Sequence, residues 1–357
     1  MNRLLRPVAM AAAVLVSTFA APLHAAPPNG YNVTNLVSDG SVPAAHTDPN
    51  LVNAWGIAFN PFGFSWVANN HTGTSTLYDG NGVANPLLVW IPSATGAGPG
   101  SPTGIVYSGS SSDFMVTKGA TSGPARFIFT SEDGVVSGWA PNVDLNYAQT
   151  AVVSTGAIYK GVALAGSGTG NRIYATDFHN NKVDVFDAGF HPVTTAGGFI
   201  DANIPVHYAP FGIQNVQGNL VVTFARQDKD REDELHGKHM GFVDVFDTEG
   251  RLLHRVGHRE GMNAPWGIAV APANFGHFSN RLLIANFGDG TISAYELDTG
   301  RFVGQLQNAD GSKIMIPGLW AIEFGNGLLS QPTNTLFFSA GPNDEAGGLY
   351  GRIDVAP

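Results

Sequence analysis

The sequence repeats one phrase six times. Each copy opens with a small, aromatic or basic residue, continues as Gly-Ile-Ala or a close variant, and runs on through short apolar strands separated by polar turns. The copies are spaced 48, 57, 51, 55 and 54 residues apart and begin at Trp55, Thr103, Lys160, Phe211, Trp266 and Trp320. A period of about 50 residues built from short strands is typical of radially stacked blades. We therefore predict an all-β, six-bladed β-propeller that forms a single domain over residues 27–357.

The composition agrees with this fold and excludes several functions. The chain holds 45 glycines and 22 prolines, and only 13% of its residues are charged, which suits short strands joined by tight turns. It has no cysteine, so thiol nucleophiles and thiolate metal sites are excluded, and a core of this size needs no disulfides. The net charge of −10 argues against a nucleic-acid partner, because phosphates require a basic surface.

The N-terminal segment is typical of a secretory signal peptide. Arg3 and Arg6 precede an apolar stretch at 8–20 and a small-residue zone at 23–26. The apolar stretch is short for a membrane span, which needs about 20 residues. The alternative interpretation is an uncleaved membrane anchor. We predict a signal peptide at 1–26, export to the periplasm or beyond, and no stable membrane insertion.

The strands of each blade can be placed from the repeat. Blade 1 is predicted to have strands at 56–59, 64–68, 75–78 and 87–91, and blade 2, the least regular copy, at 104–107, 114–117, 126–130 and 134–139. The last blade lacks an outer strand, whereas 31–38 reads as a strand without a blade. We expect these two to pair, because the pairing closes the ring and covers an exposed sheet edge.

Longer motifs carry a resemblance to known proteins. The hairpins at 172–187 and 281–295 resemble NHL-type and SMP-30-like propeller repeats. The segments 48–56, 73–80, 208–214, 263–267, 286–290 and 341–345 together resemble an uncharacterised family of exported bacterial β-propeller proteins with relatives in giant viruses. Some members of that family carry a C-terminal PEP-type sorting signal. This sequence departs from that pattern, because it stops at Ala356-Pro357 soon after its last predicted strand. The resemblance implies the fold and no particular activity.

The candidate site lies where the repeat brings side chains to one face. In a propeller, the loops before the inner strands and the turns between second and third strands surround one end of the central channel. The predicted ligand-binding residues there are Trp55, Thr103, Lys160, Phe211, Arg226, Trp266 and Trp320. The aromatic rings could bind a sugar, an aromatic ligand or a cation, or they could instead plug the channel. Lys160 would need a carboxylate, an anionic ligand or solvent.

The same face offers candidates for metal binding and for catalysis. Oxygen donors in the turns could hold Ca²⁺ or another divalent cation, and the candidates are Asn69, Asp177, Asp228, Asn286 and Asp289. Alternatively, these residues are simply what tight turns require. His71 and His179 are the candidate acid/base residues, with a solvated surface role as the alternative.

Blade 4 carries an unusual loop at 226–239, the charged loop, with nine charged residues of both signs. It could be a mobile solvated insertion, or a lid over the channel that presents Arg226 and Asp228. Our leading hypothesis is a monomer that binds a small molecule or glycan at the channel mouth. The alternatives are a cation-dependent, lactonase-like hydrolase, a histidine-dependent lyase, and a scaffold that recognises a protein through its rim.

Overall fold

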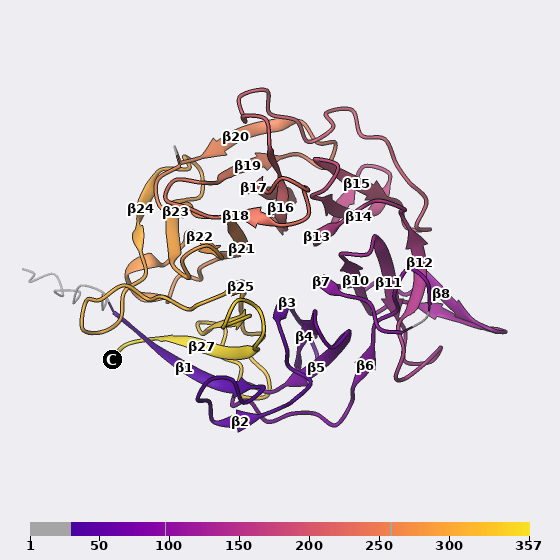
Figure 1. Ribbon diagram of the computed structural model, residues 1–357, viewed down its shortest axis with the longest axis horizontal. Coiled ribbons are helices and arrows are strands. Elements are labelled where there is room, and N and C mark those ends of the chain that lie inside the picture. Colours follow the sequence, from indigo (N-terminus) through magenta and orange to yellow (C-terminus); the bar gives the residue numbers. More distant parts are fainter. Residues whose placement is uncertain (1–29, 97, 258) are drawn as a thin grey trace, which may run out of the picture.

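Six antiparallel sheets surround a central axis in the computed structural model, which describes residues 30–96, 98–257 and 259–357 (Figure 1). The predicted signal peptide lies outside these residues. Successive innermost strands contact one another, and the sixth contacts the first, which closes the ring. They are β3 (Ala54–Phe59), β7 (Pro102–Tyr107), β13 (Tyr159–Ser167), β16 (Tyr208–Val216), β21 (Pro265–Val270) and β25 (Leu319–Phe324). The chain is therefore a six-bladed β-propeller, as predicted.

The remaining strands complete the blades from the inside outwards. Blade 1 continues with β4 (Ser65–Asn69), β5 (Thr74–Tyr78) and β6 (Val89–Trp90). Blade 2 continues with β10 (Phe127–Ser131), β11 (Val135–Trp139) and β12 (Gln149–Val153). Blade 3 continues with β14 (Gly170–Asp177) and β15 (Lys182–Phe186). Blade 4 continues with β17 (Asn219–Gln227), β19 (Phe242–Phe246) and β20 (Leu252–Val256). Blade 5 continues with β22 (Arg281–Asn286), β23 (Ile292–Glu296) and β24 (Phe302–Gln305). Blade 6 continues with β26 (Leu336–Ala340) and β27 (Leu349–Val355).

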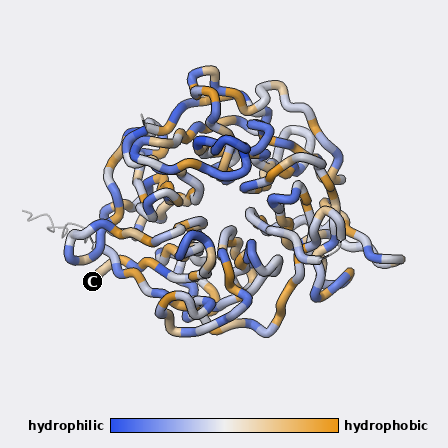
Figure 2. The backbone as a smooth tube through the Cα atoms, viewed as in Figure 1, coloured by the Kyte–Doolittle hydropathy of each residue, from blue (hydrophilic) through white to orange (hydrophobic). Residues whose placement is uncertain are grey.

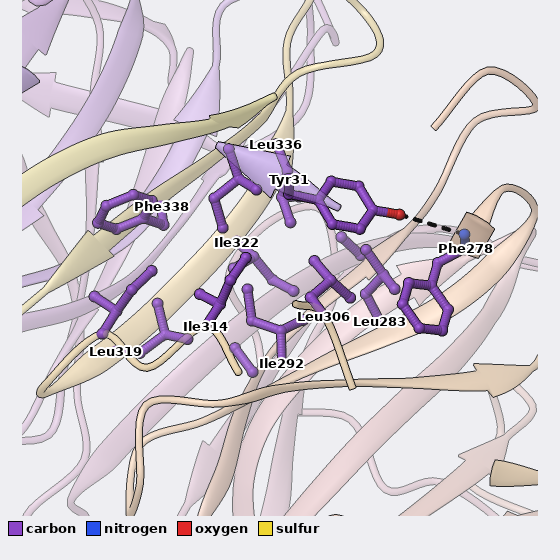
Figure 3. Close-up of a cluster of buried hydrophobic side chains, with 14 of the residues drawn as sticks. Tyr31, Phe278, Leu283, Ile292, Leu306, Ile314, Leu319, Ile322, Leu336 and Phe338 are labelled. Atoms are coloured by element: carbon purple, nitrogen blue, oxygen red, sulfur yellow. Dashed lines mark hydrogen bonds between the residues drawn. The ribbon is translucent and has the colours of Figure 1, made fainter. Parts of the chain in front are cut away.

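The N-terminal strand completes blade 6, as expected from the sequence. Strand β1 (Tyr31–Ser38) runs antiparallel to β27, and the short β2 (His46–Thr47) adds to its outer edge. The Tyr31 hydroxyl donates to the Phe275 carbonyl at 2.9 Å and accepts from the Phe278 amide at 3.3 Å, beside the short helix η1 (Gly276–Phe278) (Figure 3). These bonds anchor the closing strand to blade 5.

The predicted strand at 114–117 is wrong as a member of blade 2. Residues 115–118 form β8 (Met115–Lys118), which pairs only with β9 (Thr121–Pro124) in a separate hairpin. The second strand of the blade is β10, in which Phe127 to Phe129 are fully buried, and the outer strand is β12. The second strand of a blade is covered on both faces, and β8 buries only Val116.

The glycine of the repeated phrase lies where neighbouring inner strands approach most closely. A Cβ atom on Gly212 would lie 2.0 Å from the Trp266 carbonyl oxygen, and one on Gly56 would lie 2.5 Å from that of Thr103. No side chain fits at such distances. Gly104, Gly161 and Gly267 make equivalent close approaches to the next blade. The repeat therefore records the packing of blade against blade around the axis.

Candidate functional site

Four aromatic residues from the first position of the phrase fill the axis and form what we call the aromatic plug: Trp55, Phe211, Trp266 and Trp320. The rings of Trp55 and Trp320 stack with centroids 3.8 Å apart, and Trp266 meets both edge-on. None of the four side chains is more than 8% exposed. The structure thus favours the plug over an open ring of ligand-binding faces. Thr103 is also buried, and its hydroxyl donates to the Tyr159 carbonyl at 2.8 Å.

Lys160 has a carboxylate partner. Its side chain is 1% exposed, and its Nζ lies 2.5 Å from Glu132 Oε1 and 3.3 Å from Asp233 Oδ1. The ammonium also lies 5.2 Å from the ring centroid of Trp55, within the range of a cation–π contact. Of the three alternatives for this lysine, the structure supplies the carboxylate, and it places the ion pair directly against the aromatic plug.

The charged loop folds over the channel mouth. Its strand β18 (Glu234–Leu235) pairs with the end of β17, and the His179 ring contacts the Arg231 carbonyl at 3.2 Å. In Figure 2 the segment is a hydrophilic stretch on the inner side of blade 4, towards the axis of the ring. The position of the charged loop agrees with the lid hypothesis. Arg226 and Asp228, however, are not the residues that the loop presents to the channel. Arg226 is exposed to solvent, and Asp228 accepts from the Glu232 amide at 2.9 Å, within the loop itself.

Asp233 and Glu234 are the loop residues that face the mouth. Burial raises the pKa of Glu234 to about 8, with the charges of Glu345 and Asp233 adding to the effect and Lys160 opposing it. Burial also raises the pKa of Glu345, although Asn53 Nδ2 donates to its Oε2 at 2.6 Å. For Lys160, burial acts to lower the pKa, but Glu132, Glu234 and Asp233 outweigh it and raise the value. One ammonium therefore serves four carboxyl groups.

The turn that carries Glu345 is held in an unusual backbone conformation. Asn343, Asp344 and Glu345 have φ angles of 60°, 52° and 65°, which non-glycine residues rarely adopt, least of all in succession. Each such residue costs on the order of 1–3 kcal/mol, and residues of this kind gather at functional sites. The turn directs Glu345 towards Asn53 at the mouth and places Asp344 in a neighbouring groove.

That groove runs between the turns of blades 5 and 6 and has a volume of about 340 Å³. Phe287, Met315 and Pro317 give it an apolar part, and Phe287 stacks on Trp320 of the plug at 4.0 Å. Its polar side chains are those of His236, Asp289, Asn343 and Asp344. Since His236 belongs to the charged loop, the groove and the carboxylate cluster lie under one lid. Together we call them the mouth site.

The two predicted catalytic histidines lie at the mouth but do not pair with a carboxylate. His71 is exposed, and its Nε2 lies 3.5 Å from Asn53 Nδ2. His179 is half-buried and contacts the main chain of the charged loop. Each could still accept or donate a proton, but no acidic side chain orients either ring among the residues described.

The predicted metal ligands hold their own turns together. Asn69 donates to Thr74 and Thr76, Asp177 accepts from the Asn180 side chain at 2.8 Å, and Asp289 accepts from the Thr291 hydroxyl. Asn286 donates to the Gly261 carbonyl. Within the part of the chain that the structure describes, no group of three or more His, Asp or Glu side chains could hold a metal ion. The structure does not bring these five residues together into one site.

The misplaced strand of blade 2 explains why Glu132 was missed. If 114–117 were the second strand, the turn that faces the mouth would fall directly after residue 117. The real turn follows β10 and contains Glu132, in the position that Asn70 occupies in blade 1. The two side chains are bonded, with Asn70 Nδ2 donating to Glu132 Oε2 at 2.8 Å. A burial argument favouring 127–129 as the second strand would have found it.

The fold and this site define a six-bladed propeller whose axis is plugged by aromatic rings under an acidic, lidded mouth. Comparison with known sequences shows the family to which the chain belongs. An uncharacterized protein of Acanthamoeba polyphaga mimivirus is 34% identical over 339 residues, covering 90% of this chain and 80% of that protein. A second from the same virus is 31% identical over 341 residues, covering 90% and 85%. The chain belongs to one family with these proteins.

Solved structures agree with the fold. The PQQ-bound aldose sugar dehydrogenase of Streptomyces coelicolor has a TM-score of 0.52 at 16% identity, over 93% of this chain and all of that one. A glucose dehydrogenase has a TM-score of 0.51 at 13% identity, over 91% and 99%. No family model matches the chain. Among the described residues no helix has both the length and the apolar character to cross a membrane.

Proposed function

We propose that this protein is an exported binding protein whose mouth site takes a polyhydroxylated ligand, a glycan or its fragments. One observation carries the proposal. The charged loop adds Asp233 and Glu234 to a cluster that already contains Glu132 and Glu345, and among the described residues Lys160 is the cation paired with it. Glu132, Glu234 and Glu345 are half-buried and Asp233 is exposed, so the donors of a ligand can reach this surplus of carboxyl groups, and sugar hydroxyl or amino groups supply such donors.

The charge of the cluster also selects the ligand. Because Lys160 is already paired with Glu132, no free cation is left in it to receive an anion. An acidic ligand would place like charges together, whereas a neutral or amino sugar would not. The half-buried ring of Phe287, with Met315 and Pro317, offers an apolar surface on which the C–H face of a sugar ring could stack.

The test uses three ligand series built on the same pyranose ring, which carry a positive charge, no charge and a negative charge. Binding of short oligomers of glucosamine, glucose and glucuronate is measured by isothermal titration calorimetry on the purified full chain. We expect glucosamine oligomers to bind most tightly, glucose oligomers next, and glucuronate oligomers to fail. Asp233→Asn and Asp344→Asn should each weaken binding of the glucosamine series by about tenfold, the loss of one charge-assisted hydrogen bond.

The matched control is Glu296→Gln, which removes a carboxylate from the end of β23, where it pairs with Arg301. This variant should bind like the wild type. Equal affinity for all three series, or preference for glucuronate, would show that the carboxylate cluster does not select the ligand. Unchanged affinity in both Asp variants would place the ligand elsewhere.

A second candidate function is acid–base catalysis at the same site. The specific observation is the Glu234 carboxyl, whose pKa of about 8 lets it hold and release a proton near neutral pH beside the Lys160–Glu132 pair. His71 and His179 are the histidines that a lyase would use here. Turnover of any glycan or lactone probe that disappears in Glu234→Gln, while binding survives, would favour an enzyme over a binding protein.

Export has its own test. The signal peptide proposed at 1–26 predicts that protein produced with its native N-terminus is recovered outside the cytoplasm. N-terminal sequencing of that protein should begin close to residue 27. Recovery of the whole chain in the cytoplasm would contradict export without bearing on the ligand.

A further inference from the structure

The opposite end of the central channel holds a second set of polar groups that the mouth site does not use. Beneath the aromatic plug lie two adjoining cavities that share Ile57, Ile105, Gln214 and Glu323. The inner one is bounded by Trp266, and the outer one has a volume of about 200 Å³. Together we call them the rear cavity. Since the plug fills the axis, the rear cavity and the mouth site lie on opposite sides of it.

The rear cavity contains a carboxyl group without a partner. Glu323 lies on β25 and lines both cavities, and its side chain makes no hydrogen bond or ion pair with any residue the structure describes. Gln214 on β16 is likewise without a side-chain partner in the described chain. Burial raises the pKa of Glu323 to about 8. Both side chains are half-buried and neither has a polar partner among the described residues, so their polar groups remain available to a ligand.

These two residues are departures from the repeat. The fourth position of the phrase is small or apolar in the other four blades, as Ala58, Val106, Ala163 and Ala269. Only blades 4 and 6 replace it with Gln214 and Glu323. In blade 4 the close approach to the next blade is made by Gly212, and blade 6 has Ala321 at that position. The buried apolar residues beside the polar pair are Ile213 and Ile322. The polar pair therefore has no role in the scaffold.

We propose that the rear cavity is a binding site for a small organic monocation, an ammonium group carried on an apolar body. Glu323 would pair with the ammonium, and the Gln214 side-chain oxygen would accept a second hydrogen bond from it. Ile57 and Ile105 supply apolar walls, while Phe59 and Tyr107 supply aromatic rings that also attract cations. A lone carboxylate with one amide falls short of the several oxygen ligands a divalent metal requires.

The volume limits the size of the ligand. A cavity of about 150 Å³ accepts a benzene ring. The outer rear cavity, at about 200 Å³, is thus large enough for a single ring with a one-carbon amino arm. Benzylamine is the probe that matches this size and chemistry. Benzyl alcohol has the same shape without the charge, and benzoate carries the opposite charge.

The experiment measures binding of the three probes to the full-length protein by calorimetry at about pH 8.5, where Glu323 is largely ionised. We expect benzylamine to bind, benzyl alcohol to bind at least about tenfold more weakly, and benzoate not to bind. Glu323→Gln should reduce the affinity for benzylamine by at least about tenfold. This isosteric change removes an unpaired, half-buried charge, so the fold should tolerate it.

Two further variants keep the result unambiguous. Val106→Phe fills the outer cavity while leaving Glu323 in place, and it should abolish benzylamine binding. Glu296→Gln, which removes a carboxylate far along blade 5, should leave it unchanged. Absence of benzylamine binding, or full binding in Glu323→Gln or Val106→Phe, would overturn the proposal. The glycan experiment at the mouth can succeed or fail independently, because none of its variants lines the rear cavity.

Discussion

The indole Nε1 of Trp266 donates a hydrogen bond to the main-chain carbonyl of Lys160 at 2.9 Å, which links blade 5 directly to blade 3 across the axis. The bond is fully buried, and it fixes the backbone of the residue whose side chain forms the central ion pair. The plug is thus more than a filling of apolar rings. It positions Lys160 beneath the charged loop.

Trp266→Phe should therefore destabilise the protein more than Trp55→Phe does. Both changes replace an indole of the plug by a smaller ring, but Trp55 Nε1 has no hydrogen-bond partner within the described structure. Only Trp266→Phe leaves a buried carbonyl without its donor, at a cost of about 1–3 kcal/mol. Urea unfolding of both variants measures the difference. Equal losses would mean that the bond contributes nothing to stability.

Gly212→Ala should be strongly destabilising, because its Cβ would lie 2.0 Å from the Trp266 carbonyl oxygen. Relieving that overlap requires blades 4 and 5 to separate, and overpacking of this kind costs about 1–3 kcal/mol or more. Gly168→Ala is the matched control, since a Cβ there meets nothing within 4 Å. The melting temperature should fall only in the first variant. A similar fall in both would show that backbone conformation, and not blade packing, decides the effect.

Lys160→Met should cost about 3 kcal/mol, because it leaves Glu132 beside the plug without its cation. Adding Glu132→Gln to this variant should restore part of the loss, since the unpaired charge is then gone. A double-mutant cycle by chemical denaturation gives the coupling energy. Simple additivity of the two changes would contradict a direct ion pair.

Stability should fall as the pH rises from about 5 to 8. The pKa of Glu234 rises from 4.5 to about 8 on folding, mainly through burial. The folded state therefore holds a proton that the unfolded chain has released, and raising the pH favours unfolding through this window. In Glu234→Gln the decline of the unfolding free energy with pH should be shallower than in the wild type. An identical slope in both proteins would show that Glu234 titrates normally.

The repeat alone was enough to predict the number of blades, the gathering of aromatic residues at the axis and the closure of the ring by the strand at 31–38. These features follow from spacing and from the need to cover a sheet edge. The composition of the mouth site was harder to foresee. Asp233 and Glu234 reach Lys160 only because β18 pairs back onto β17, a two-residue strand with no pattern of its own. Glu345 depends on a left-handed turn that Asn343 and Asp344 tolerate but that a glutamate rarely adopts.

The rear cavity was visible in the sequence in a different way. When the six copies of the phrase are compared, Gln214 and Glu323 are the polar residues at a position that is otherwise small or apolar. The side chains at this position come near one another only when the strands are arranged around the axis. A polar residue in one copy of a repeat is unremarkable by itself. Two of them at the same position, facing one cavity, are informative only once the geometry is known.

The pairing of β1 with β27 has a mechanical consequence. Tyr31 lies opposite Val355, so the first described residues and the last lie side by side at one end of the same ladder. A force that pulls these two ends apart would load the hydrogen bonds one pair at a time, from Val355 inward, as in a zipper. Blade 6 would then peel open at low force, while a pull across any other blade would have to shear several bonds together. Under such a pull, the pairing of β1 with β27 should be the first part of the ring to open.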